Sequence, residues 1–375
     1  MAKLIALFGG RKFRFWYQTL PLKQKKMMLS WQNILMMLTI LAGLGMFYYI
    51  SHLQETPITK RIRFIAFTDE QFMKIANFEA KLQENMKENL FLPATHPSYI
   101  RVIQIMECLV HKNWALSNMK TQKWKVAILD SFDINAYVLA SGHVFVNVGL
   151  LNFVQNDDQL AFVLAHEIAH SLLGHAAEKV SFAQMIDYFV IIVMAAIWAF
   201  MPFDGIALVT QVFYEKVVQI LLDSPYSRKL EREADIVGLE LAAKACFDVR
   251  EGSNFWKLMQ FHEKLKGTET PEWLSTHPSN VKRQELIEHF IPKAISIREQ
   301  YHCNPLSEND PRDFCLFSFL HILPFHLFFF TLPFLIFAPF AVSPFPSILY
   351  FSLSFFALLI FSSLIIWYIL FIFPF

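Results

Sequence analysis

Charged side chains are scarce in this sequence, and those present are unevenly distributed. Only 17% of its 375 residues are charged. An average soluble domain contains about 25%, so the composition argues against an ordinary cytosolic protein or a disordered tail. Residues 1–54 contain seven lysines and arginines and no acidic residue, whereas residues 314–375 contain no charged side chain. No basic patch interleaved with aromatic residues occurs in the middle of the chain, which excludes a nucleic-acid partner.

Cysteine is also scarce. The four cysteines are widely separated, with no C-x-x-C pair and no dense disulfide framework. The pattern favours buried or free thiols. A bridge between Cys246 and Cys303 is a hypothesis that an oxidising compartment would allow.

The first 54 residues predict a basic leader, residues 1–30, followed by a membrane-spanning helix, residues 31–54. The apolar centre of the span, residues 34–50, is short for a hydrocarbon core of about 30 Å, but the uncharged stretch around it is longer. A cleaved secretory signal is disfavoured because no small-x-small site follows, whereas a mitochondrial transit peptide is compatible. The positive flank places the N-terminus on the cytoplasm-like side and the bulk of the chain across the membrane.

The middle of the chain predicts a mainly α-helical α+β fold with a small sheet. Apolar residues at helical spacing predict a helical layer over residues 55–120, and alternating apolar residues predict strands within residues 125–150. Asn156, which two aspartates follow, favours the start of a long helix that we expect to run to about Ala177. Residues 121–313 are expected to form the main folded domain.

That long helix contains the run His166-Glu167-Ile168-Ala169-His170. Histidines four positions apart lie on one face of a helix, so both imidazoles can reach one metal ion. Glu167 lies beside that face and can take a proton from a water molecule that zinc has made more acidic. Because so short a pattern recurs by chance, an amphipathic helix with two hydrogen-bonded histidines is the alternative.

A second helical segment, residues 227–235, offers the third protein ligand that a catalytic zinc site needs. Glu231 and Asp235 share one helix face, so one carboxylate can bind the metal while the other accepts a hydrogen bond from a ligand imidazole. Glu233 points to a different side and cannot share that face. A solvated charged helix face is the alternative interpretation of this segment.

Together these two segments resemble peptidase family M48, a family of zinc metallopeptidases in which H-E-x-x-H on one helix is followed by S-R-x-x-E-x-x-A-D on a second. The resemblance implies a zincin-type fold and one zinc ion per chain. It implies that His166, His170 and Glu231 bind the zinc, that Glu167 is the general base, and that Asp235 supports a ligand imidazole.

A T-H-P stretch with His277 at its centre, followed by Arg283, also resembles that family. The resemblance implies that His277 stabilises the oxyanion of the tetrahedral intermediate, where a hydrogen-bond donor has its largest effect. It implies that Arg283 orients Glu231 and Asp235. A turn residue before proline is the alternative interpretation of His277.

Residues 135–151 resemble the edge strand beside the cleft of the family, where the backbone of an extended substrate pairs with the enzyme. His143 is interpreted as a surface residue of that strand, and His175 as a structural residue about 140° around the helix from His170. The residues expected to bind substrate are Gly142, Val144, Phe145 and Val146.

Within the family, the resemblance is closest to a mitochondrial inner-membrane branch, on residues 52–57, 226–231, 242–246 and 271–279. It implies a stress-responsive metalloendopeptidase of membrane quality control whose catalytic domain faces the intermembrane space. The implied substrates are membrane-anchored proteins with extended membrane-proximal segments, including a dynamin-like fusion GTPase.

Two alternative functions stay open, and so does the oligomeric state. A catalytically silent membrane scaffold would be expected to lose Glu167 or a ligand, and this chain keeps them. A CAAX prenyl-protein peptidase of the endoplasmic reticulum is disfavoured, because that branch has many spans and this chain has one clear span before its catalytic core. The oligomeric state is not fixed by the sequence, and a homo-oligomer is compatible with it.

Two further apolar segments concern the membrane. Residues 188–222 separate the paired histidines from Glu231, so a single crossing there would divide the zinc ligands between the two sides. We therefore expect this segment to lie on or dip into the membrane surface, with a buried core helix as the alternative. The phenylalanine-rich tail, residues 314–375, is expected to be either a second span or a non-native C-terminus.

Overall fold

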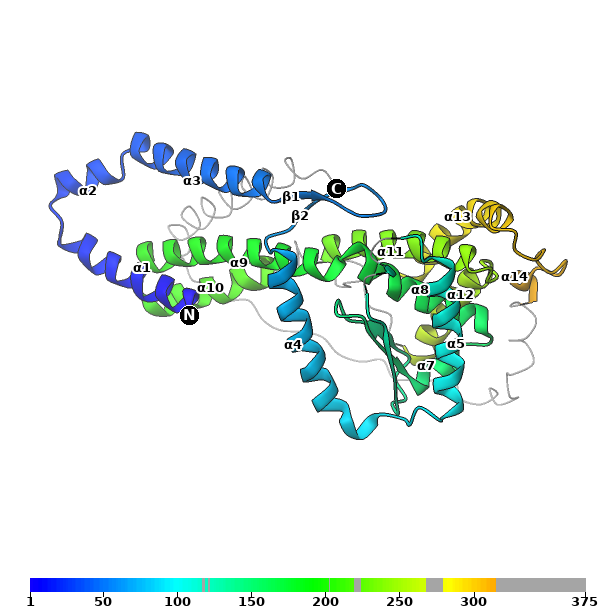
Figure 1. Cartoon of the computed structure of the whole chain (residues 1–375). Coiled ribbons are helices and arrows are strands. Elements are labelled where there is room, and N and C mark those ends of the chain that lie inside the picture. The colour runs from blue at the N-terminus through cyan, green and yellow to red at the C-terminus, as the bar shows by residue number, and fades with distance from the viewer. Residues whose placement is uncertain (117–118, 121, 202, 219–223, 268–278, 315–375) are drawn as a thin grey trace, which may run out of the picture. The chain divides into compact units, whose positions relative to one another are not determined.

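Helix α8 (Asp157–Leu173) forms the centre of the folded domain (Figure 1). The computed structural model describes residues 1–116, 119–120, 122–201, 203–218, 224–267 and 279–314. The Asn156 side chain caps this helix by accepting the backbone N–H of Gln159 at 2.9 Å. Most of its residues are apolar and buried, as in a helix covered on all sides. The predicted end at Ala177 is wrong, because Gly174 adopts φ 67° and terminates the helix after Leu173.

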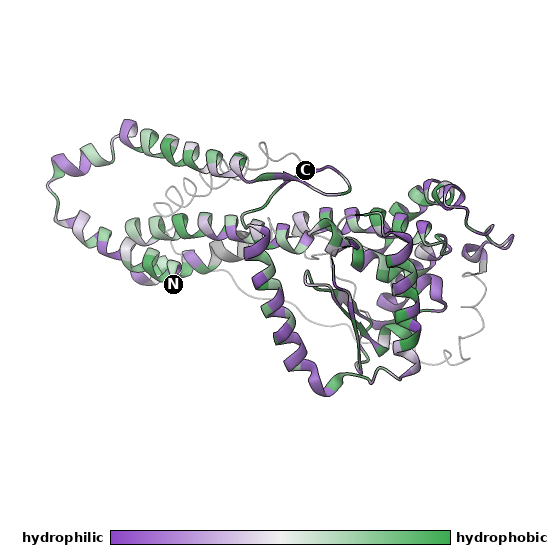
Figure 2. Ribbon diagram, in the orientation of Figure 1, coloured by the Kyte–Doolittle hydropathy of each residue, from purple (hydrophilic) through white to green (hydrophobic). Residues whose placement is uncertain are grey.

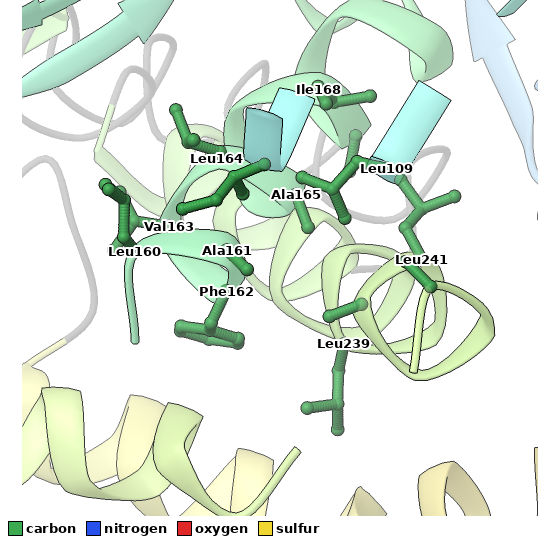
Figure 3. Packing of buried hydrophobic residues seen from close by; sticks show 14 of the residues in the cluster. Leu109, Leu160, Ala161, Phe162, Val163, Leu164, Ala165, Ile168, Leu239 and Leu241 are labelled. Carbon is green, nitrogen blue, oxygen red and sulfur yellow. The ribbon is translucent and has the colours of Figure 1, made fainter. Parts of the chain in front are cut away.

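Four other helices complete the core: three of them pack directly on α8, and the fourth packs on two of those three. Figure 3 shows Leu109 of one of them beside Ala165 of α8, and Leu239 and Leu241 of another belong to the same buried cluster. These four helices are α5 (Pro97–Lys112), α11 (Ser224–Lys244), α12 (Glu251–Lys266) and α13 (Asn280–Gln300). The shorter or peripheral elements are α4 (Asp69–Lys87), η1 (Glu88–Leu90), α7 (Val148–Phe153) and α14 (Pro311–Phe314).

A three-stranded sheet lies beside this core. Its strands are β3 (Lys125–Leu129), β4 (Ala136–Val138) and β5 (His143–Asn147), in the order β3-β5-β4. β5 pairs in parallel with β3 and antiparallel with β4. The edge strand expected within residues 135–151 is therefore only partly confirmed: β5 is hydrogen-bonded on both sides, which contradicts the prediction for residues 142–146, whereas β4 is an edge strand.

The N-terminal part of the chain is helical and is followed by a short hairpin. It contains α1 (Ala2–Thr19), α2 (Leu22–Met28), α3 (Trp31–Ser51), β1 (Leu53–Glu55) and β2 (Ile62–Phe64). No residue of α3 is buried, and Figure 2 shows that hydrophobic residues make up most of it. α3 is long and apolar enough to cross a membrane, which is consistent with the span predicted at its position.

Helix α9 (His175–Phe200) passes the same test of length and composition as α3, and no other helix among the described residues does. It is followed by α10 (Asp204–Val218), which packs against it. That residues 188–222 lie at the membrane surface stays a prediction. The predicted second span in the tail lies outside the described residues, apart from residue 314.

Helix α1 packs along α9, although its sequence predicts a leader. Lys3 forms an ion pair with Asp187 at 3.0 Å, and the buried Arg14 donates to the carbonyl of Met201 at 2.7 Å and pairs with Asp204. The two backbones approach closely at Gly10, where an added Cβ would lie 2.5 Å from a carbonyl oxygen of α9.

A disulfide joins Cys246, just after α11, to Cys303, just after α13, with a Cα–Cα distance of 5.2 Å. The hypothesis of this bridge is therefore correct. The interpretation as a free thiol holds for Cys108, which is half-buried, whereas Cys315 lies outside the described residues.

We predict that Gly10→Leu separates α1 from α9, because the added side chain has no room at that contact. The measurement is thiol cross-linking in a Lys3→Cys, Asp187→Cys background, with and without Gly10→Leu. Gly9→Leu is the matched control, since a Cβ at Gly9 meets nothing within 4 Å. Equal cross-linking in the two glycine variants would contradict the packing.

Candidate metal centre

Three side chains from two helices converge on one point. α8 supplies His166 and His170, whose Nε2 atoms are 3.1 Å apart. α11 supplies Glu231, whose Oε2 is 3.5 Å from Nε2 of His166 and whose Oε1 is 3.6 Å from Nε2 of His170. All three potential ligand atoms lie within 4.8 Å of one another.

The two helices can supply these ligands together because their backbones almost touch. Gly238 of α11 faces His166, and an added Cβ there would lie 2.8 Å from the Cα and the N atom of that histidine. Ala234, one turn earlier, is also small and fully buried. Small residues on this face of α11 therefore let the carboxylate of Glu231 reach the two imidazoles.

The convergent side chains open into a cleft of about 830 Å³. Glu167 is half-exposed and lines the same cleft, next to the histidines. Other lining residues come from β4 and its approach, from α12, and from the start of α13; they include Asn135, Ala136, Tyr137, Val138, Phe255, Trp256, Met259, Asn280 and Arg283. The edge strand β4, the carboxylate of Glu167 and the three potential ligands therefore share one cavity.

Behind His166 lies a fully buried ion pair. Nδ1 of His166 is 3.0 Å from Oδ1 of Asp235, which accepts Arg283 at 2.6 Å, while the second oxygen of the same carboxylate accepts Arg283 at 2.8 Å. Arg283 also lies 3.4 Å from Glu231, and its guanidinium stacks 3.7 Å from the ring centroid of Trp256. The arrangement fixes Glu231 and the outer nitrogen of His166 together.

The electrostatics of the centre favour a cation. Burial and the charge of Arg283 would lower the pKa of His166, but hydrogen bonds to Asp235 and Glu231 outweigh them and raise it to about 9. Burial would raise the pKa of Asp235, yet Arg283 and His166 lower it, so this carboxylate stays ionised. The site that the carboxylates create around His166 therefore stabilises positive charge.

A second polar network, which the sequence interpretation missed, lies behind His170. Nδ1 of His170 is 2.9 Å from Nδ1 of His175, and Nε2 of His175 is 3.3 Å from Oε2 of Glu233. Arg61 contacts that carboxylate at 2.9 and 2.7 Å. Burial would raise the pKa of Glu233, but hydrogen bonds from His175, Arg61 and Thr59 lower it to about 2.

The interpretation of His175 as a structural residue agrees with its burial, but its contact with His170 was missed because one continuous helix was assumed. Five residues along one helix place two side chains on different faces. The chain instead breaks at Gly174, and His175 opens α9. The break turns His175 back toward His170.

The structure does not bring the other predicted site residues that it describes into the cleft. His277 is outside the described residues. Gly142 is in a turn at φ 86°, and Val144, Phe145 and Val146 are buried in the middle strand. None of these four lines the cleft. The side chain of His143 faces away from it, toward Glu84 at 3.2 Å.

The three donors fit a metal ion of the zinc type. Two imidazole nitrogens and one carboxylate are a ligand set that leaves a fourth position open for water or substrate. The outer nitrogen of each histidine has a hydrogen-bond partner, as metal-binding imidazoles require.

Comparisons with known proteins identify the family of this chain. The family model for peptidase family M48 matches residues 101–291. The chain is 40% identical to the mitochondrial metalloendopeptidase OMA1 of Bos taurus over 83% of this chain and 60% of that one. It is 39% identical to the Homo sapiens protein of the same name, over 86% and 62%, and 32% identical to that of Saccharomyces cerevisiae, over 71% and 77%. The chain thus spans about three fifths of its mammalian relatives.

We predict that Asp235→Asn weakens zinc binding about 10- to 100-fold, because the neutral amide no longer balances Arg283 or holds the outer nitrogen of His166. The measurement is competition with a chromophoric chelator. Glu240→Gln is the matched control, since Glu240 lies on the same helix but pairs with Lys293 at the surface. Equal affinities for the two variants would argue against a role for Asp235.

Proposed function

Since this chain belongs to peptidase family M48, we propose that it is a zinc-dependent metalloendopeptidase that cleaves membrane-anchored proteins. The observation that carries the proposal is the convergence of His166, His170 and Glu231 in a cleft that Glu167 also lines. Zinc held by these three residues would acidify a water molecule and polarise the scissile carbonyl. One zinc ion per chain is proposed.

In the proposed reaction, Glu167 is the general base. Its carboxylate takes a proton from the attacking water and passes it to the leaving amine. Arg283 and Asp235 position Glu231 and His166 through their buried hydrogen bonds. His277 is proposed to donate a hydrogen bond to the developing oxyanion, on the resemblance of its T-H-P stretch alone.

The substrate is proposed to bind as an added strand on β4. The N–H of Leu139 donates to the carbonyl of His143, and the carbonyl of Asn135 accepts from the N–H of Asn147. The backbone N–H and C=O groups of odd-numbered residues therefore face β5. By the alternation of an antiparallel ladder, the N–H and C=O groups of Ala136 and Val138 face away from β5. Main-chain pairing of this kind recognises extended segments without a strict sequence requirement.

The proposed location is the mitochondrial inner membrane, with the catalytic domain facing the intermembrane space. The relatives named above are mitochondrial metalloendopeptidases. The apolar helix α3 and the basic residues that precede it support an anchor with the N-terminus on the opposite side. A role in membrane quality control and the processing of a dynamin-like fusion GTPase are proposed on family resemblance.

We predict that Glu167→Gln lowers kcat about 100-fold or more, because the amide keeps the shape of the side chain but cannot accept the proton of water. The assay is cleavage of a membrane-anchored reporter with an extended stalk, and Glu240→Gln is the control. Equal cleavage by wild type and Glu167→Gln would assign the activity to a contaminating protease. Absence of cleavage by the wild type would favour the scaffold alternative.

We predict that Val138→Pro lowers kcat/KM for an extended peptide about fivefold to tenfold, because one N–H that faces away from β5 is lost. Val138→Ala is the matched control, since it shortens the side chain and keeps the N–H. Zinc content should be equal in both variants. Identical kcat/KM values would contradict substrate pairing at β4.

A further inference from the structure

The polar chain behind His170 leads from the metal centre to the hairpin that follows the membrane helix. It begins at Nδ1 of His170, passes through His175 and Glu233, and ends at Arg61. His175 is 2% exposed, so these contacts are shielded from water. Arg61 lies in the turn of the hairpin formed by β1 and β2, which starts two residues after α3.

The geometry determines which nitrogen of His175 carries the proton. Nε2 of His170 faces the other two potential ligands, so its Nδ1 must carry the hydrogen if Nε2 is to bind a metal. That N–H points at Nδ1 of His175, which must therefore accept it. His175 then carries its own hydrogen on Nε2, where Glu233 is the acceptor at 3.3 Å.

The carboxylate of Glu233 is held by residues of the hairpin as well as by the helices that carry the potential ligands. Arg61 contacts Glu233 through Nε and a terminal nitrogen, and Thr59 donates to its other oxygen. Arg61 also makes two hydrogen bonds of 2.8 Å to the buried Glu178 of α9, which in turn accepts the hydroxyl of Tyr226 at 2.6 Å. A guanidinium that donates hydrogen bonds to two carboxylates is held in a fixed position.

We propose that His175 and Glu233 are positioning residues for the metal ligand His170, and that Arg61 makes the membrane-proximal hairpin part of the metal centre. His170 is thereby supported as His166 is, except that an imidazole stands between the ligand and its carboxylate. The zinc affinity of the centre consequently depends on the docking of residues 59–61, which lie in the turn between β1 and β2. This inference deepens the proposed function and rests on it.

The experiment measures zinc affinity and the visible spectrum of the cobalt-substituted full-length chain in detergent. His175→Phe keeps a ring but removes the acceptor, whereas His175→Gln keeps an acceptor. We expect His175→Phe to weaken zinc binding about 10- to 100-fold and to shift the d–d band of Co²⁺, and His175→Gln to restore most of both. Zinc affinity and a cobalt spectrum equal to wild type in His175→Phe would overturn the proposal.

Arg61→Ala tests the hairpin separately, because Arg61 touches no potential ligand. We expect it to weaken zinc binding severalfold and to leave the helical content measured by circular dichroism unchanged. Arg101→Ala is the matched control, since Arg101 also joins two elements through an acidic partner, Asp157 at 2.7 Å, away from the centre. Equal zinc affinities in Arg61→Ala and Arg101→Ala would overturn the part of the proposal that concerns the hairpin.

The cleavage assay separates this proposal from the proposed function. The variants could change zinc binding as expected while the wild type never cleaves the reporter. That result would support the positioning role and contradict the peptidase activity. A cleaving wild type whose zinc affinity is untouched by His175→Phe would leave the peptidase intact and contradict the positioning role.

Discussion

The close contact between α8 and α11 is the constraint on which the metal centre depends. Gly238 lets the two backbones approach, and only at that separation can Glu231 meet His166 and His170. A larger residue at 238 would push against the backbone of His166 itself, so packing and chemistry are fixed by the same few atoms. The disulfide after α11 and α13 adds a covalent link between the helix of Glu231 and the helix that carries Arg283.

The buried charges of the centre balance one another, but their burial carries a desolvation cost that offsets much of their attraction. Arg283 and Asp235 are both buried, and removing one partner of such a pair costs about 3–5 kcal/mol because the other charge is left uncompensated. A well-packed apolar pair would be at least as stable. The pair contacts the potential ligands His166 and Glu231, and the hydrogen bonds from His175 to Arg61 lie in the same way behind His170.

The sequence predicted the parts of the fold that depend on local patterns. The cap at Asn156, the strands within residues 125–150 and the placement of His166 and His170 on one helix face follow from spacing and residue type alone. Several features set by contacts between distant segments were missed. The pairing of β5 on both sides, the packing of α1 on α9 and the partnership of His175 with Glu233 all depend on such contacts. No local pattern encodes them.

The central claim is that the paired histidines of α8 bind zinc in the folded chain. The most direct test is the zinc content of the purified full-length protein compared with a His166→Ala, His170→Ala double variant, measured by atomic emission after removal of loosely bound metal. The account predicts about one zinc per chain in the wild type and none in the double variant. Equal zinc contents in the two proteins would contradict it.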